Sequence, residues 1–180
     1  MNVLLIGLRC SGKSTLAPTL AQRLGYLHVE MDDLVAAALN CATPGEAFAK
    51  GATEFREAEA ECLSKLLGGT AQVISAGGGA PTAPGAAEMI QKARDVHRVG
   101  VLYLRAEPSV LQERLRADLA LRPAITGTNP VDEVPTIFAQ RDSLYQELAD
   151  MTIQVDALSA EQVAIRAEKC VRVLMKNSGV

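Results

Sequence analysis

The sequence has no tryptophan, only three tyrosines and three phenylalanines, and no excess of basic residues. Lysine and arginine together number 18 against 21 aspartates and glutamates, which gives a net charge of −3. Proteins that bind nucleic acids normally present a basic surface and often stack bases on aromatic side chains. We therefore expect no nucleic-acid partner.

A long hydrophobic run is also missing. No stretch approaches the roughly 18 apolar residues of a membrane helix, and no basic region followed by an apolar segment and a cleavage site opens the chain. The four cysteines are scattered without a C-x-x-C pair, and the two histidines are isolated. A disulfide framework and a histidine or cysteine metal site are therefore not expected. These features favour a cytoplasmic protein that binds no membrane.

Short apolar runs alternate with longer amphipathic stretches along the 180 residues. This alternation predicts one α/β domain, a three-layer α/β/α sandwich with a five-stranded parallel sheet. The expected strands, all read as buried, are 2–6, 27–29, 72–76, 99–104 and 151–155. The expected helices are 13–24, 33–40, 53–67, 83–94, 107–119, 133–149 and 159–176. The polar stretch 116–133 is either a surface connection or a mobile cover over a site.

The first apolar run leads into GLRCSGKST, residues 7–15, which fits the phosphate-loop pattern G-x-x-x-x-G-K-[ST] without a mismatch. Its glycines let successive backbone N–H groups point into one concavity, and the following helix adds its N-terminal amides. In this pattern Lys13 reaches the β- and γ-phosphates and the Ser14 hydroxyl ligates Mg²⁺. The sequence therefore predicts a P-loop NTPase fold that binds a nucleoside triphosphate. The residues assigned to the nucleotide are Gly7, Arg9, Cys10, Ser11, Gly12, Lys13, Ser14 and Thr15.

Charged residues fall on the apolar faces of two expected helices. At 100° per residue, Glu59 lies among Phe55, Cys62, Leu63 and Leu66, with Arg56 one turn back at the edge of that arc. Arg141 lies within the apolar stripe of 133–149. A buried charge needs a partner, so Arg56 and Glu59 could form a structural ion pair. Two inward arginines on different helices favour instead a pocket for a carboxylate or phosphate.

Two further motifs follow expected strands. Gly77, Gly78 and Gly79 stand after the strand 72–76, where bare backbone can approach a ligand closely, although a flexible turn would have the same composition. Asp32 and Asp33 follow the strand 27–29, where one of them could cap the next helix or could face an accepting hydroxyl. Ligands of open α/β sheets bind at the carboxyl ends of the strands, where all these motifs lie.

In this order the motifs resemble those of the shikimate kinase family. The family carries a P-loop, an acidic D-[ST]-D, F-R-x-x-E, G-G-G, R-P-L in a lid, and R-x-x-L-Y. The matching segments here are 7–15, Glu30-Met31-Asp32, Phe55-Arg56-Glu57-Ala58-Glu59, Gly77-Gly78-Gly79, Arg122-Pro123-Ala124 and Arg141-Asp142-Ser143-Leu144-Tyr145. The likeness extends to about residue 156, which is most of the chain.

The resemblance implies ATP- and Mg²⁺-dependent phosphorylation of the 3-hydroxyl of shikimate by a monomer, in the pathway to chorismate and the aromatic amino acids. It places a lid at about 114–130 and a substrate-binding helical region at about 32–62 of one kinase domain, 1–180. It assigns catalysis to Lys13, Asp32 and Arg122, the substrate to Asp32, Arg56, Gly77, Gly78, Gly79 and Arg141, the metal to Ser14 and Glu30, and further nucleotide contacts to Arg116 and Pro123.

The chain departs from the family pattern at a few positions. Glu30 stands where the family usually has aspartate, and Ala52 replaces the glutamate that usually follows the glycine before F-R. Arg114 and Arg116 both lie about one position from the arginine that meets adenine, and Arg116 is our choice. Two alternatives stay open: a kinase for another hydroxylated acid such as quinate or gluconate, and a P-loop module that binds ATP without phosphorylating a metabolite.

Overall fold

The computed structural model describes residues 1–117 and 129–177. Five parallel strands form one sheet in the order β2-β3-β1-β4-β5. The strands are β1 (Asn2–Ile6), β2 (Leu27–Glu30), β3 (Gln72–Ser75), β4 (Val99–Arg105) and β5 (Met151–Gln154). The central strands β1 and β4 are almost wholly buried, as near-continuous apolar runs in a sheet covered on both faces should be.

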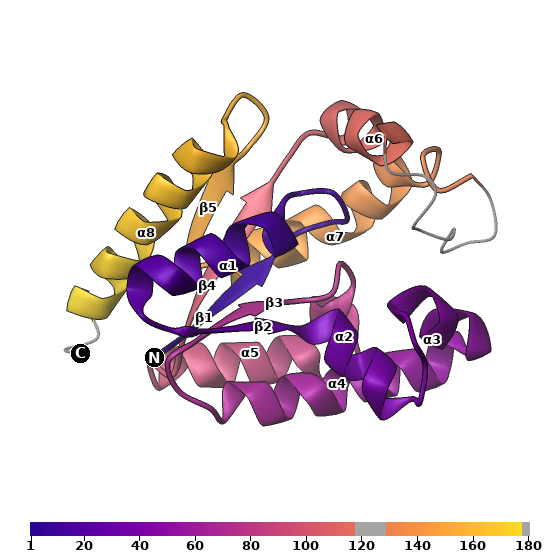
Figure 1. The fold of residues 1–180 in the computed structure, drawn as a ribbon, viewed down its shortest axis with the longest axis horizontal. Coiled ribbons are helices and arrows are strands. Elements are labelled where there is room, and N and C mark those ends of the chain that lie inside the picture. Colours follow the sequence, from indigo (N-terminus) through magenta and orange to yellow (C-terminus); the bar gives the residue numbers. More distant parts are fainter. Residues whose placement is uncertain (118–128, 178–180) are drawn as a thin grey trace.

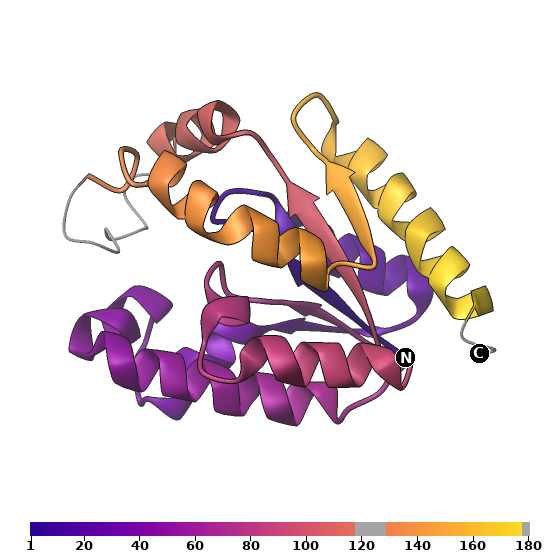
Figure 2. The same cartoon turned by 180° about the vertical axis from the view of Figure 1, so that it is seen from behind.

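Helices cover both faces, so the predicted three-layer α/β/α sandwich is confirmed (Figures 1 and 2). Helices α1 and α8 lie on one face of the sheet, and α5 and α7 lie on the other with α4 beside α5. The helices are α1 (Lys13–Leu24), α2 (Met31–Ala38), α3 (Pro44–Lys50), α4 (Ala52–Leu67), α5 (Ala86–Asp95), α6 (Pro108–Ala117), α7 (Val134–Leu148) and α8 (Ala160–Asn177), with a 3₁₀ turn η1 (Ala80–Thr82). No helix among the described residues is long and apolar enough to cross a membrane.

Two expectations are wrong, one about the edge strands and one about the helix after β2. Strand β2 is not buried, because it forms one edge of the sheet, and Leu27 is 64% exposed. Strand β5 forms the other edge, and Ile153 is its one buried residue. Helix α2 begins directly after β2 with Glu30 at its N-cap position, so Asp32 and Asp33 lie in the first turn and neither caps the helix. This placement puts the Asp32 carboxylate beside Gly77, at the edge of the sheet where the strands end.

The motifs singled out in the sequence lie at this edge of the sheet. The P-loop follows β1, Glu30 ends β2, and the three glycines follow β3. The register pairs Glu30 with Ser75 on β3, and Ser75 in turn lies beside Leu5 near the end of β1. Because the strands are parallel, their carboxyl ends bring these segments together in space.

Candidate active site

The P-loop is held in shape by three residues with positive φ angles and by one lysine. Gly7 and Gly12 have φ of 151° and 96°, and a Cβ on Gly7 would lie 2.6 Å from the Leu104 carbonyl oxygen. Cys10 has φ of 62°, a conformation that is uncommon for a residue with a side chain. The Lys13 Nζ donates to the carbonyls of Gly7 (2.8 Å) and Leu8 (3.0 Å). The ammonium group therefore lies inside the loop, where the pattern predicts it.

Two cavities meet at this loop. The larger, about 520 Å³, extends from the P-loop to the start of α2, helices α3 and α4 and the glycine turn. The smaller, about 340 Å³, lies between the P-loop, Arg114 and the segment that joins β5 to α8. Among the described residues, Lys13 and Ser14 alone line both cavities. A phosphoryl group passing from one cavity to the other would therefore move past these two side chains.

The smaller cavity changes one assignment. Arg116 is exposed on α6 and is not among the residues that line this cavity, whereas Arg114 is. The Arg114 guanidinium donates to the carbonyls of Cys10 and Val155, both at 3.3 Å. Two residues along a helix turn a side chain by about 200°, so Arg114 and Arg116 point to different sides of α6. Arg114 takes its place as the candidate nucleotide contact.

Each glycine of the turn after β3 faces a different predicted substrate residue. A Cβ on Gly77 would lie 2.4 Å from the Asp32 Oδ1 and 2.6 Å from the Glu59 Oε1. A Cβ on Gly79 would lie 2.3 Å from the Arg56 Nη1. The Gly78 carbonyl accepts hydrogen bonds from the Arg141 Nη1 at 3.0 Å and the Tyr145 hydroxyl at 2.9 Å. The structure thus brings Asp32, Arg56 and Arg141 around one turn of bare backbone.

The Gly77→Ala variant is expected to lower kcat/KM by about tenfold or more. Its methyl group would displace both the Asp32 and Glu59 carboxylates, and overpacking of this kind costs about 1–3 kcal/mol. Gly68→Ala is the matched control, since its Cβ would meet nothing closer than 3.4 Å and its φ of −78° suits any residue. Steady-state kinetics on both variants makes the comparison. Equal kinetics would mean that Asp32 and Glu59 can move without consequence.

The inward charges on α4 form the predicted ion pair. Arg56 pairs with Glu59, whose side chain is only 1% exposed. Burial raises the pKa of Glu59, and the Arg56 guanidinium opposes that shift. The Arg56 guanidinium also lies over the rings of Phe48 (5.9 Å) and Phe55 (5.8 Å). Arg56 is thereby held in one place while it lines the larger cavity.

Arg141 lies on the other side of the turn. It is half-buried and lines a small pocket of about 20 Å³ with Arg9 of the P-loop and Ile137, rather than the larger cavity itself. Its charge is nevertheless felt by Glu59 and by Tyr145, whose pKa is raised to about 12 by burial. Both inward arginines therefore act on the Glu59 carboxylate, Arg56 from beside Gly79 and Arg141 from the Gly78 carbonyl. The sequence-based assignment of the two arginines to a ligand anion stays a prediction.

The metal-binding prediction is compatible with the residues at the end of β2. Burial raises the pKa of Glu30, and the hydroxyls of Ser75 and Ser14 oppose the shift. The Ser75 Oγ is fully buried beside Glu30 and makes no hydrogen bond of normal geometry within the described residues. A carboxylate with two hydroxyls is the oxygen donor set that Mg²⁺ and its bound waters prefer. The described ranges contain no group of three or more His, Cys, Asp or Glu side chains that could hold a metal alone.

Comparison with known proteins agrees with this geometry. The sequence matches the protein-family model for shikimate kinase over residues 9–172. The chain belongs to the shikimate kinase family. It is 37% identical to the shikimate kinase of Oleidesulfovibrio alaskensis over 154 residues, covering 82% of this chain and 84% of that protein. It is 34% identical to the enzyme of Symbiobacterium thermophilum, covering 91% of each chain.

Shikimate kinases are among the similar solved structures. The shikimate kinase of Acinetobacter baumannii in complex with shikimate superposes with a TM-score of 0.81 at 27% identity, covering 98% of this chain and 93% of that one. The P-loop fold of the family is therefore shared over nearly the whole chain. The predicted lid residues Arg122 and Pro123 lie outside the described residues, so their roles stay predictions.

The sequence did not predict one wall of the larger cavity. Helix α3 was not expected, yet Thr43, Pro44, Gly45 and Phe48 line the larger cavity. A signal was present: the Thr43 hydroxyl accepts from the Glu46 N–H at 3.1 Å, and the Glu46 carboxylate accepts from the Ala42 N–H at 2.9 Å. A threonine followed three residues later by glutamate, with proline in the first turn, is a helix-start pattern.

Proposed function

We propose that this protein phosphorylates the 3-hydroxyl of shikimate with ATP, giving shikimate 3-phosphate and ADP on the route to the aromatic amino acids. Membership of the shikimate kinase family supports the proposal. The single observation that carries it is the glycine turn, around which Asp32, Arg56 and Arg141 converge beside the P-loop. One kinase domain, 1–180, would act as a cytoplasmic monomer on small molecules, without nucleic acid or membrane.

The phosphate end would be held by the P-loop. Backbone amides of residues 7–15 would face the phosphate oxygens, with the helix N-terminus of α1 behind them. Lys13 would leave the carbonyls of Gly7 and Leu8 for the β- and γ-phosphates, which offer the ammonium group a stronger partner. The adenine end would lie in the smaller cavity against Arg114.

The acid end would be held by the two arginines. The Arg56 guanidinium lines the larger cavity, and Arg141 would exchange the Gly78 carbonyl for the shikimate carboxylate. A guanidinium binds a carboxylate through two parallel N–H donors, which fixes the plane of the ring as well as its position. The helical region 32–62 would enclose the ring, since α2, α3 and α4 supply most of that cavity's wall.

Asp32 would orient the accepting hydroxyl and take its proton. It lines the larger cavity with Lys13 and lies close to Gly77, so one carboxylate oxygen can face a hydroxyl between the ring and the P-loop. A bound Mg²⁺, held by Ser14 and through water by Glu30, would neutralise charge on the β- and γ-phosphates. Glu30 is one methylene longer than aspartate, and the neighbouring Ser75 hydroxyl would help to fix it.

The test is ADP release from ATP and Mg²⁺ with shikimate, with quinate, with gluconate and with no acceptor. Turnover with shikimate at more than ten times the rate with the other acids is expected, because all three acids carry one carboxylate but differ in the carbon skeleton and hydroxyl positions that must meet Asp32. Preferred turnover with another acid would keep the mechanism and replace the substrate. Binding of ATP without turnover on any acid would favour the alternative of a non-catalytic ATP-binding module.

A further inference from the structure

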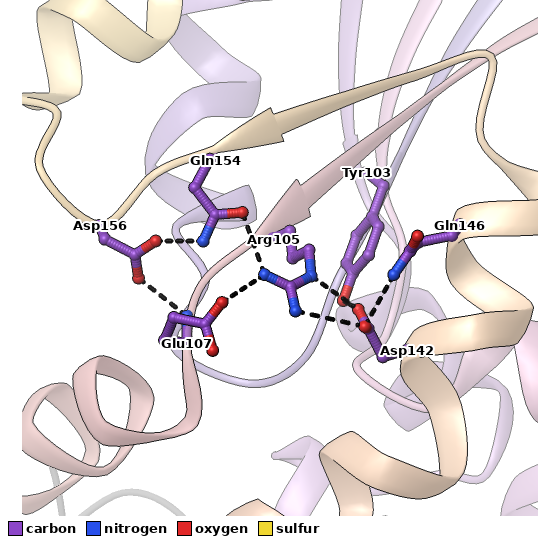
Figure 3. A network of polar contacts seen from close by, with 7 residues as sticks. All are labelled: Tyr103, Arg105, Glu107, Asp142, Gln146, Gln154 and Asp156. Carbon is purple, nitrogen blue, oxygen red and sulfur yellow. Dashed lines mark hydrogen bonds and ion pairs between the residues drawn. The ribbon is translucent and has the colours of Figure 1, made fainter.

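A network of polar side chains ties the middle of α7 to the ends of β4 and β5 (Figure 3). It contains Tyr103, Arg105, Glu107, Asp142, Gln146, Gln154 and Asp156. None of these residues was assigned a contact with ATP, shikimate or the metal, although Asp142 occupies an unspecified position of the R-x-x-L-Y motif. Asp142, however, adjoins Arg141, which raises the question of what the network holds in place.

The middle of α7 is packed less deeply than its two ends. Val134 and Ile137 are buried near the start of the helix, and Tyr145 and Leu148 are buried near its end. Between Ile137 and Tyr145 no residue of the helix is fully buried, and the apolar side chains there, Phe138 and Leu144, pack only partly against the core. Polar contacts therefore add to weaker apolar packing in holding the turn that carries Arg141.

Asp142 supplies these contacts. Its Oδ1 accepts from the Tyr103 hydroxyl at 2.8 Å and from the Arg105 Nε at 3.0 Å. Its Oδ2 accepts from the Arg105 Nη2 at 3.3 Å and from the Gln146 Nε2 at 2.7 Å. Burial would raise the pKa of Asp142, but the hydrogen bonds from Arg105, Tyr103 and Gln146 outweigh it and hold the pKa below its ordinary value. The Gln146 contact lies within α7, but the three hydrogen bonds from Tyr103 and Arg105 join the helix to β4 and restrict its rotation here.

Arg105 is itself fixed on its other side. Its Nη1 pairs with the Glu107 carboxylate at 2.5 Å and donates to the Gln154 Oε1 at 3.2 Å. Its guanidinium lies 4.9 Å from the centre of the Phe138 ring, one turn before Asp142 on α7. The chain of contacts therefore starts in the sheet and ends on the helix, and the Arg105–Asp142 pair is its central link (Figure 3).

We propose that Asp142, held by Arg105, is a positioning residue that sets Arg141 at the Gly78 carbonyl for binding the substrate carboxylate. The inference rests on the role of Arg141 in the proposed function. Arg141 and Tyr145 both reach the Gly78 carbonyl from α7, so a rotation of this helix moves both donors together. The Tyr103 ring also packs edge-on against Tyr145 with centroids 5.6 Å apart, which links Asp142 to the same carbonyl by a second route.

The first test compares Asp142→Asn with a matched break at the end of the same helix. Asp150 follows α7 and accepts from the Arg94 Nε at 3.0 Å and the Val101 N–H at 2.8 Å. Its side chain is 22% exposed, against 15% for Asp142. Both Asn variants remove one similarly buried ion pair, so both should lower Tm.

The kinetics should separate the two variants. Asp142→Asn is expected to raise the KM for shikimate roughly two- to thirtyfold, the range found for residues that act on a site through contacts. Its KM for ATP and its kcat should stay within about twofold, because weaker binding in both ground and transition states affects KM alone. Asp150→Asn should leave both KM values unchanged. An unchanged shikimate KM in Asp142→Asn, or an equal rise in Asp150→Asn, overturns the positioning role.

Three more variants serve as controls for the test. Arg105→Gln removes the other half of the pair and should repeat the selective KM effect even if Asp142→Asn folds poorly; an unchanged shikimate KM in this variant counts against the proposal. The double variant should be no worse than the more affected single variant, since both break the same link. Arg141→Ala distinguishes the two levels of inference. If it leaves the shikimate KM unchanged, the proposed carboxylate clamp fails; if it raises that KM while Asp142→Asn and Arg105→Gln do not, only the positioning role fails.

Discussion

Lys13→Ala is expected to lower kcat by at least about 10²–10³-fold, the effect of removing one preorganised donor from a developing negative charge. The Lys13 side chain is 7% exposed and lies within the P-loop, where it needs to move only a short way to reach a phosphate. A coupled assay for ADP release measures the loss. Near-normal kcat would contradict the phosphate-binding role of the loop.

Folding of this variant must be controlled separately, because the Lys13 ammonium also satisfies two carbonyls of the loop. Lys13→Met keeps most of the apolar stem and removes only the charge, so it should lose activity to the same degree with a smaller change in Tm. Lys65→Met is the matched surface control: Lys65 pairs with Glu61 on the exposed face of α4 and should tolerate the change.

Asp32→Asn is expected to lower kcat about 10²–10⁴-fold, because the amide cannot take a proton from the accepting hydroxyl. The KM for ATP should change little. Asn has nearly the same shape as Asp, so the close approach to Gly77 is kept. Asp33→Asn is the control on the adjacent position of α2, where the side chain is exposed. A similar loss in both variants would mean that negative charge at this helix, rather than one positioned carboxylate, supports turnover.

The fold was largely predictable because its signals are local. Five apolar runs separated by helical patterns leave few arrangements, and the P-loop pattern fixes how β1 meets α1. The exposure of the edge strand β2 was not predictable, since a strand at the edge of the sheet can have the same composition as one inside it. Helix α3 was missed because seven residues give too short a pattern for helical periodicity, even though Thr43 and Glu46 mark its start.

For the candidate site, the residue types were easier to predict than their directions. Glu59 and Arg141 could be recognised as inward charges from helical spacing alone. The choice between Arg114 and Arg116 needed the actual rotation of α6 against the loop after β5, which no local pattern contains. The attachment of Arg141 to the Gly78 carbonyl is a contact across 63 positions of the chain. Such a contact depends on how the layers pack, so spacing within one helix could not give it.

Among the described residues, the two cavities share only Lys13 and Ser14, and this arrangement bears on whether both substrates are bound at once. Within residues 1–117 and 129–177, protein residues line each cavity, so one substrate does not have to bind before the site for the other exists. Initial rates measured against both substrates should therefore give intersecting rather than parallel double-reciprocal lines. Such a result would mean that the phosphoryl group passes directly between two molecules bound at once; parallel lines would instead indicate a phosphorylated enzyme intermediate.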